Sequence, residues 1–320
     1  MNTDRLAWFL VGATAVGKTA VAQCLAEKSG VAILSADAML VYRGMDIGTA
    51  KPTPAERGAT RYFGLDLVNP DQPFSTGTWL AHVREQLHDQ PFGHSAAREP
   101  DAASLIVAGG TGLYIRVLTS GLDAAPADAS RRLYWQKRLE TEGLDALRRE
   151  LASRSPSALA QLADPENPRR VIRALEHLDI SGTLPDNWQQ ASRPRVTGLR
   201  LPRAALHERI AARVERMFAS GFVDEVAALR KKFPAWSATA AQAIGYSEVC
   251  EMLDGRMTQA QAIALIAQRT RQLAKRQETW FRHQADVTWV DAAPDESVES
   301  LAARVLATWR EHGATTIQMP

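Results

Sequence analysis

Apolar runs and segments of helical periodicity alternate along the first third of the chain. Residues 6–11, 31–34 and 105–108 are continuous or nearly continuous apolar runs, which are typical of strands buried on both faces of a parallel sheet. Residues 18–28 and 78–88 instead repeat apolar side chains at the spacing of an amphipathic helix. This alternation predicts an α/β core.

The pattern becomes almost entirely helical after residue 121. Amphipathic or basic helices are expected at residues 131–140, 144–152 and 167–180. A strand-like segment and further helices follow, at residues 196–201, 206–232, 239–253, 258–284 and 298–311. The expected organisation is therefore a first part of the core at 1–121, a helical insertion domain at 122–195 and the remainder of the core with C-terminal basic helices at 196–320. Residues 88–104 are expected to form a surface insertion and residues 313–320 a disordered tail.

Composition narrows the class of protein only a little. The 320 residues carry 38 Lys and Arg against 36 Asp and Glu, so a nucleic-acid partner would have to be held by local patches. Cys24 and Cys250 are too few and too far apart in sequence to indicate a thiolate metal site or a disulfide. The sequence shows no secretory leader and no apolar segment of membrane-spanning length. We expect a cytoplasmic monomer without a membrane partner.

A phosphate-binding loop follows the first predicted strand. The pattern G-x-x-x-x-G-K-[ST] is matched by Gly12, Ala13, Thr14, Ala15, Val16, Gly17, Lys18 and Thr19. Backbone N–H groups at the start of the next helix would bind a phosphate or diphosphate, Lys18 would add a positive charge, and the Thr19 hydroxyl would ligate Mg²⁺. The loop alone leaves open whether the phosphate is transferred, hydrolysed or expelled. The predicted fold class is α/β, with a P-loop NTPase-like parallel sheet core and a helical insertion domain.

Asp37 is the acidic residue that the core strands deliver beside this loop. It follows the second predicted strand, and ligands bind at the carboxyl ends of strands in such sheets. The strand at 105–108 ends in Gly109, Gly110 and Thr111, whereas phosphoryl-transfer proteins of this type normally have an acidic residue there to hold magnesium. Asp37 is therefore a candidate base acting on an acceptor. The arrangement suits displacement of diphosphate at carbon as well as attack on phosphorus.

Two predicted helices present clustered basic residues. Arg169, Arg170 and Arg173 form one cluster, next to Glu176. The helix at 258–284 interleaves basic residues with Trp280 and Phe281, as RNA-binding surfaces do. An ordinary solvated helix face remains an alternative for both.

Several motifs together resemble the tRNA dimethylallyltransferase family. They lie in the family's order at residues 12–19, 37–52, 109–114, 170–176, 243–246 and 270–280. The runs at 43–52 (RGMDIGTAKP) and 270–280 (TRQLAKRQETW) are long and specific, and the resemblance extends over about residues 6–289.

The resemblance implies transfer of a dimethylallyl group from dimethylallyl diphosphate to the exocyclic amine of the adenosine just 3′ of the anticodon. The loop from Gly12 to Thr19 would hold the diphosphate with Mg²⁺, Asp37 would take the proton, and Thr111 would lie close to the target base. Contacts with the tRNA anticodon stem-loop would come from Asp37, Ala38, Met39, Leu40, Thr111, Arg132, Arg169, Arg170, Arg173, Gln242, Gly245, Tyr246, Lys275, Arg276 and Arg282.

The chain also departs from the family pattern. Ala38 stands where serine is usual, Ala13 where proline is usual, Tyr62-Phe63 where paired histidines are common, and Thr78 where aspartate is common. Two other functions stay open at this point. One is a nucleoside or nucleotide kinase that uses the same loop, and the other is a tRNA-binding relative with weakened or lost chemistry.

Overall fold

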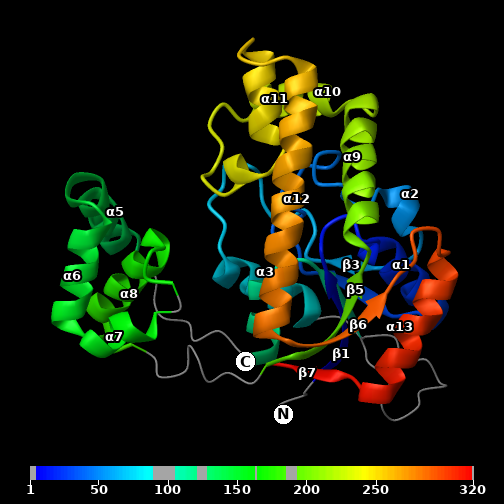
Figure 1. The fold of residues 1–320 in the computed structure, drawn as a ribbon, viewed down its shortest axis with the longest axis horizontal. Coiled ribbons are helices and arrows are strands. Elements are labelled where there is room, and N and C mark those ends of the chain that lie inside the picture. Colours follow the sequence, from blue (N-terminus) through cyan, green and yellow to red (C-terminus); the bar gives the residue numbers. More distant parts are fainter. Residues whose placement is uncertain (1–4, 89–104, 121–127, 163, 185–192, 319–320) are drawn as a thin grey trace. The chain divides into compact units, whose positions relative to one another are not determined.

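The computed structural model describes residues 5–88, 105–120, 128–162, 164–184 and 193–318. The chain forms two compact units, one made of Met1–Gly121 with Arg193–Pro320 and the other of Leu122–Ser192 (Figure 1). Of the predicted surface insertion at 88–104, His88 is the last residue of helix α3 (Thr76–His88) and residues 89–104 lie outside the described residues. Within the described residues, no helix has the length and apolar character needed to cross a bilayer.

The larger unit is built on a seven-stranded sheet. Its strand order is β3-β2-β4-β1-β5-β6, all parallel, and β7 pairs antiparallel with the start of β1. The strands are β1 (Arg5–Gly12), β2 (Ala32–Ser35), β3 (Tyr62–Phe63), β4 (Leu105–Gly109), β5 (Arg195–Arg200), β6 (Asp286–Asp291) and β7 (Thr315–Ile317). This sheet confirms the predicted parallel α/β core.

The register of the central strands aligns their carboxyl ends. Val11 of β1 lies opposite Gly109 of β4, and Ser35 of β2 lies opposite Ala108. The loops that follow these three strands therefore start at one edge of the sheet, which is where parallel sheets bind their ligands. The strands themselves are held by buried apolar side chains such as Phe9, Leu10 and Ile33.

Helices cover the sheet on both faces. In the strand order, the connection from β1 to β2 runs toward β3, and the connection from β3 to β4 runs back toward β1. Because both crossovers are right-handed, their helices lie on opposite faces of the sheet. On one side α1 (Lys18–Ser29) packs against α13 (Val298–His312). On the other, α4 (Gly112–Ser120) contacts both α3 (Thr76–His88) and α12 (Gln259–Gln284). The short helix α2 (Pro54–Arg57) precedes β3.

Glycines divide two segments that helical periodicity joins into single helices. The segment predicted at 206–232 consists of α9 (Arg203–Ala219) and α10 (Phe222–Lys232), because Gly221 has a φ of 91°. The segment predicted at 239–253 consists of a 3₁₀ turn, η2 (Ala240–Gln242), and α11 (Tyr246–Leu253). The long helix α12 runs beside α9, and α10 and α11 pack at their end (Figure 1).

The C-terminal tail differs from the prediction of disorder. Residues 315–317 form β7, which pairs with Arg5, Leu6 and Ala7 of β1. Ile317 is buried, and Gln318 donates a backbone hydrogen bond to Leu118. A single apolar residue, Ile317, within the residues of β7 is a weak sequence signal for a strand. The strand forms because β5 pairs only with Leu10, Val11 and Gly12 of β1, so the start of β1 is available to β7.

The smaller unit is a helical bundle with its own core. It contains α5 (Ala129–Glu142), α6 (Leu144–Arg154), α7 (Pro156–Gln161) and α8 (Pro168–Ser181). Trp135, Leu147, Leu151, Val171 and Leu175 are among its buried core residues. Since these side chains pack on one another, each helix buries an apolar face within the unit itself.

Candidate active site

The phosphate loop has the backbone shape of an anion-binding nest. β1 ends at Gly12 and α1 begins at Lys18, with Gly17 at a φ of 106°. Ala15 also has a positive φ, 65°, which is uncommon for a residue with a side chain and occurs where a turn is functionally constrained. The Lys18 ammonium donates to the carbonyls of Gly12 and Ala13, at 3.0 and 2.6 Å. The loop therefore keeps its cation close to the backbone that would surround a phosphate.

A second cation reaches the loop from α9. The Arg213 guanidinium donates to the Thr14 hydroxyl at 3.2 Å and to the Thr49 carbonyl at 3.1 Å. Burial lowers the pKa of Lys18 to about 8, with Asp37 raising it and Arg213 lowering it further. Burial also lowers the pKa of Arg213, which Asp37 opposes. Two desolvated cations thus share the influence of one carboxylate.

That carboxylate belongs to Asp37, which follows β2. Its Oδ1 accepts a hydrogen bond from the Met39 amide at 2.9 Å. The residues on either side of Asp37 are joined to the second glycine turn: the Thr111 amide donates to the Ala36 carbonyl at 3.0 Å, and the Ala38 amide donates to the Thr111 hydroxyl at 3.0 Å. Thr111 therefore fixes the backbone that carries the candidate base.

Helix α12 connects the two loops. The Thr14 amide donates to Gln277 Oε1 at 2.8 Å, and Gln277 Nε2 donates to the Gly110 carbonyl at 3.1 Å. A Cβ on Gly110 would lie 2.2 Å from Gln277 Nε2, and one on Gly112 would lie 2.1 Å from the Trp280 ring. A side chain at position 112 would therefore collide with the Trp280 ring, and one at position 110 would displace the Gln277 amide from its place beside the turn.

A buried aromatic pair lies beneath this turn. Tyr114 stacks on Trp79 with 4.0 Å between the ring centroids and 16° between the planes. Burial raises the pKa of Tyr114, and the negative charge of Asp37 raises it further. The phenol consequently stays protonated.

Of the eleven predicted tRNA contacts in the larger unit, four are exposed, five are half-buried and two are buried. Ala38, Met39 and Leu40 are half-buried. Exposed side chains are those of Gln242, Lys275, Arg276 and Arg282. Arg282 donates to Glu278 at 2.8 Å, so part of its charge is balanced within α12.

Tyr246, which is predicted as a tRNA contact, lies away from the surface. The Tyr246 side chain is fully buried, and its hydroxyl donates to Glu225 at 2.7 Å. Gly245, which precedes it, is also buried. The ring lies on the apolar, inward-facing side of α11. Its hydroxyl contacts Glu225, which binds the backbone of residues 46–48.

Two of the four arginines predicted as tRNA contacts in the smaller unit pair with the buried Glu176, and the other two have exposed side chains. Glu176 is fully buried and pairs with Arg132 at 3.1 Å and with Arg173 at 3.0 Å. Arg169 and Arg170, at the start of α8, are exposed. Arg169 and Arg170 keep their side chains at the surface, Arg132 of α5 joins that helix to α8 through Glu176, and Arg173 pairs with Glu176 within α8 itself.

Arg213 and Gln277 are site residues that sequence reasoning missed. Both are polar side chains on otherwise apolar helix faces: Arg213 lies with Ile210 and Met217, and Gln277 lies with Ala274 and Phe281, all of which are buried. A polar residue in the middle of an apolar stripe is the signal that could have identified them.

The donor groups of the site fit magnesium held through a phosphate. Thr19 is exposed at the start of α1, where its hydroxyl is available as a ligand. The described residues contain no group of three or more His, Cys, Asp or Glu side chains placed to hold a metal. Mg²⁺ commonly uses few protein ligands and completes its shell with water and substrate phosphates, so Thr19 suits such an ion.

Known proteins are similar in sequence to this chain over most of its length. The sequence model of a family described as IPP transferase matches residues 40–284. A tRNA dimethylallyltransferase from Geobacter metallireducens is 40% identical over 289 residues, covering 88% of this chain and 90% of the relative. One from Syntrophobacter fumaroxidans is 40% identical over 305 residues, covering 93% and 86%.

A solved structure agrees as well. The full-length tRNA isopentenylpyrophosphate transferase from Bacillus halodurans is 32% identical, covers 97% of this chain and 98% of its own, and superposes with a TM-score of 0.66. A eukaryotic dimethylallyltransferase acting on tRNA, 22% identical, shares the fold with a TM-score of 0.78. The matched segment and the extent of these similarities show that the chain belongs to the IPP transferase family, whose named relatives are tRNA dimethylallyltransferases.

Proposed function

We propose that this chain transfers a dimethylallyl group from dimethylallyl diphosphate to the N6 amine of the adenosine 3′ of the anticodon in tRNA. In the reaction the amine nitrogen forms a bond to the allylic carbon, and the bond from that carbon to the diphosphate oxygen breaks. Diphosphate leaves, and the amine loses one proton. This chemistry needs a site that binds the diphosphate, an oriented general base and a surface that binds the RNA.

The proposal assigns the leaving diphosphate to the phosphate loop. The backbone amides from Gly12 to Thr19 would bind its oxygens, and Lys18 and Arg213 would balance its charge. A cation-rich site stabilises the additional negative charge that develops on a leaving group as its bond to carbon breaks. Thr19 would ligate Mg²⁺, which when bound would neutralise part of the diphosphate charge.

The observation that carries the proposal is the position of Asp37. Its charge acts on both Lys18 and Arg213, and its backbone is joined through Thr111 to the second glycine turn. An adenine amine is a weak nucleophile, and a carboxylate held beside the leaving group is suited to accept its proton as the new bond forms. The glycine turn after β4 supplies no acidic residue for the magnesium arrangement of a kinase.

Exposed basic residues would hold the tRNA. Lys275, Arg276 and Arg282 of α12 and Arg169 and Arg170 of α8 carry side chains at the surface of their units. The target adenine must leave its stack to reach a site beside the phosphate loop. Unstacking costs on the order of a few kcal/mol, which contacts with the tRNA backbone would offset.

Transfer of a labelled group tests the proposal. The purified protein is incubated with Mg²⁺, unmodified tRNA and dimethylallyl diphosphate labelled in the allyl group. Label is expected on the adenosine next to the anticodon. If no tRNA accepts label while [γ-³²P]ATP transfers its terminal phosphate to a nucleoside or nucleotide, the protein is a kinase. Binding of tRNA without either reaction would identify a relative that has lost the chemistry.

A further inference from the structure

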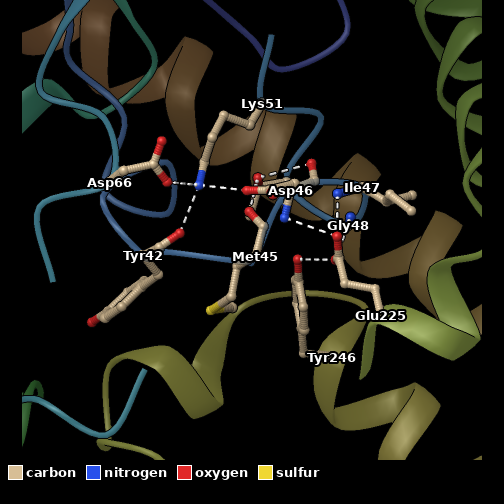
Figure 2. A network of polar contacts seen from close by, with 10 residues as sticks. Tyr42, Met45, Asp46, Ile47, Gly48, Lys51, Asp66, Glu225 and Tyr246 are labelled. Atoms are coloured by element: carbon tan, nitrogen blue, oxygen red, sulfur yellow. Dashed lines mark hydrogen bonds and ion pairs between the residues drawn. The ribbon is translucent and has the colours of Figure 1, made fainter. Parts of the chain in front are cut away.

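Residues 42–52 form an irregular segment that is held from two sides (Figure 2). On one side is Lys51, whose side chain is 3% exposed. Its ammonium donates to the Tyr42 carbonyl at 2.6 Å and forms ion pairs with Asp46 at 2.7 Å and Asp66 at 2.6 Å. A buried cation with three oxygen partners closes the two ends of the segment onto each other.

On the other side is Glu225, in the first turn of α10. Its Oε2 accepts the amides of Asp46 and Ile47 at 3.0 and 2.7 Å, and its Oε1 accepts the amide of Gly48 at 3.3 Å (Figure 2). The Tyr246 hydroxyl also donates to Oε1, at 2.7 Å. Three consecutive amides that converge on one anion form a nest, and here the anion is the protein's own carboxylate.

The segment at 42–52 packs tightly against α10, which carries Glu225, and α11, which carries Tyr246. A Cβ added to Gly48 would lie 2.3 Å from the Phe222 ring and 2.6 Å from the Tyr246 ring. Tyr246 and Phe222 are themselves packed edge to face. The backbone of Asp46, Ile47 and Gly48 therefore has little room to move while Glu225 holds it.

The next residue along connects this arrangement to the phosphate loop. The Thr49 carbonyl accepts from Arg213 Nη2, and Arg213 Nη1 donates to Thr14 in the loop. The Thr49 hydroxyl donates back to the Met45 carbonyl at 2.6 Å, which makes the turn rigid. The position of the Arg213 guanidinium thus depends on a carbonyl one residue beyond the amides that Glu225 holds.

We propose that Glu225 is a positioning residue for diphosphate binding: by holding the amides of residues 46–48 it places the Thr49 carbonyl, and this carbonyl aims Arg213 at the phosphate loop. The proposal rests on the proposed function of the loop. It assigns no contact with substrate to Glu225 and predicts that the residue acts through Arg213.

The chemistry of the carboxylate explains why glutamate is suited to this position. Four donors, three amides and one phenol, converge on its two oxygens, and each carboxylate oxygen has two acceptor lone pairs. Glutamine keeps one oxygen and would present an N–H₂ group to donors on its other side. The change Glu225→Gln preserves the shape of the side chain and leaves at least one of the amide donors without its partner.

The test is a double-mutant cycle on the full-length protein, with binding of inorganic diphosphate measured by calorimetry in Mg²⁺. Glu225→Gln is expected to raise the Kd about tenfold, and Arg213→Gln at least as much. The double variant is expected to match Arg213→Gln within about twofold, because a residue acting through Arg213 has no further effect once Arg213 is lost. Asp224→Asn removes the same charge from an exposed neighbour in the same helix turn and is the matched control.

A second variant and a second measurement separate positioning from folding. Tyr246→Phe removes one donor to Glu225 and is expected to raise the Kd about threefold, so it tests the proposal even if Glu225→Gln does not fold. In steady state the KM for dimethylallyl diphosphate should rise while the KM for tRNA stays the same. A general folding defect would lower the active fraction and leave both KM values unchanged.

Three outcomes overturn the proposal. It is wrong if Glu225→Gln and Tyr246→Phe bind diphosphate as the wild type does, if the losses from Glu225→Gln and Arg213→Gln multiply, or if Asp224→Asn weakens binding as much as Glu225→Gln. In each of these cases wild-type binding of diphosphate would be intact, so the function proposed for the loop would stand. Failure of the wild-type protein to bind diphosphate would overturn both.

Discussion

The cations at the phosphate loop and the arginines of the helical unit are used in opposite ways. Lys18 and Arg213 donate to backbone carbonyls and a hydroxyl, and neither forms an ion pair with a carboxylate among the described residues. In the helical unit, Arg132 and Arg173 share the buried carboxylate of Glu176, and Arg154 pairs with Asp179 at 2.7 Å.

The difference separates cations that are available to bind an anionic ligand from cations that stabilise the fold through ion pairs. A cation whose partners are carbonyls keeps its full charge, which a phosphate group can then balance. A cation paired with a buried carboxylate has its charge largely neutralised and mainly joins two helices. Counting arginines in the sequence therefore overestimates the electrostatic attraction of the helical unit for RNA.

The largest expected effect comes from the one carboxylate at the phosphate-loop site. Asp37→Asn should lower the rate of group transfer roughly 100- to 10,000-fold, as expected for loss of a general base. Diphosphate should bind at least as tightly as before, because the change removes a negative charge close to Lys18 and Arg213. Single-turnover kinetics and calorimetry measure the two quantities, with Asp71→Asn, at an exposed position, as control. An Asp37→Asn variant with wild-type turnover would exclude Asp37 as the base.

The second effect tests the structural use of charge in the helical unit. Glu176→Gln leaves Arg132 and Arg173 without their shared carboxylate and should destabilise this unit by about 2 kcal/mol, a value reduced because both arginines are partly exposed. Hydrogen exchange of the α5 and α8 amides in the full-length protein measures this local loss. Arg148, which pairs with the exposed Glu166 at 2.6 Å, offers the control: Glu166→Gln should change protection little. Equal loss of protection in both variants would contradict the distinction.

The third effect is a pH dependence that only the phosphate-loop cations should show. Burial lowers the pKa of Lys18 to about 8, so the protein without ligand loses this charge as the pH rises through 8. In the proposed function, diphosphate would bind best to the protonated lysine. The KM for dimethylallyl diphosphate should consequently be constant below pH 7 and rise by up to about tenfold per pH unit above pH 8. In Lys18→Met the KM should be higher throughout and should lack this rise; an identical rise in the variant would assign it to another group.

The smallest effect concerns an exposed arginine of the helical unit. Arg170→Gln should weaken tRNA binding by about two- to fivefold and reduce the slope of log Kd against log salt by about 1, as expected for loss of one phosphate contact. Arg173→Gln should change the slope less, because its guanidinium is ion-paired with Glu176 at 3.0 Å. Fluorescence anisotropy with labelled tRNA over a salt series measures both. Equal changes in slope would show that the ion pair does not prevent Arg173 from binding RNA.

The sequence predicts the parts of the fold that have strong local patterns. The apolar runs that form β1, β2 and β4 are recognisable because strands buried on both faces contain few polar residues. Tyr62 and Phe63, which depart from the family's common histidines, form the short strand β3 beside β2. This strand, β6 and β7 escaped prediction. β3 and β7 have only two and three residues, which carry no periodicity, and pairing with a neighbouring strand decides the conformation of all three.

The site is predictable where a motif fixes the backbone and less so where side chains arrive from distant helices. The phosphate loop, Asp37 and Thr111 follow three parallel strands, so topology alone brings them to one edge. Arg213 and Gln277 come from α9 and α12, and only the packing of those helices brings their side chains to Thr14. The burial of Tyr246, which is predicted as an RNA contact, was not foreseen because a family motif does not distinguish a buried ring from an exposed one.

The identity of the leaving group is the most direct test of the account. In a single turnover with enzyme in excess over tRNA, we expect one inorganic diphosphate for each adenosine that gains a dimethylallyl group, in the wild type and in any variant that retains activity. Release of inorganic phosphate in place of diphosphate, or modified adenosine formed without diphosphate, would contradict the assignment of the phosphate loop as the site of the leaving group.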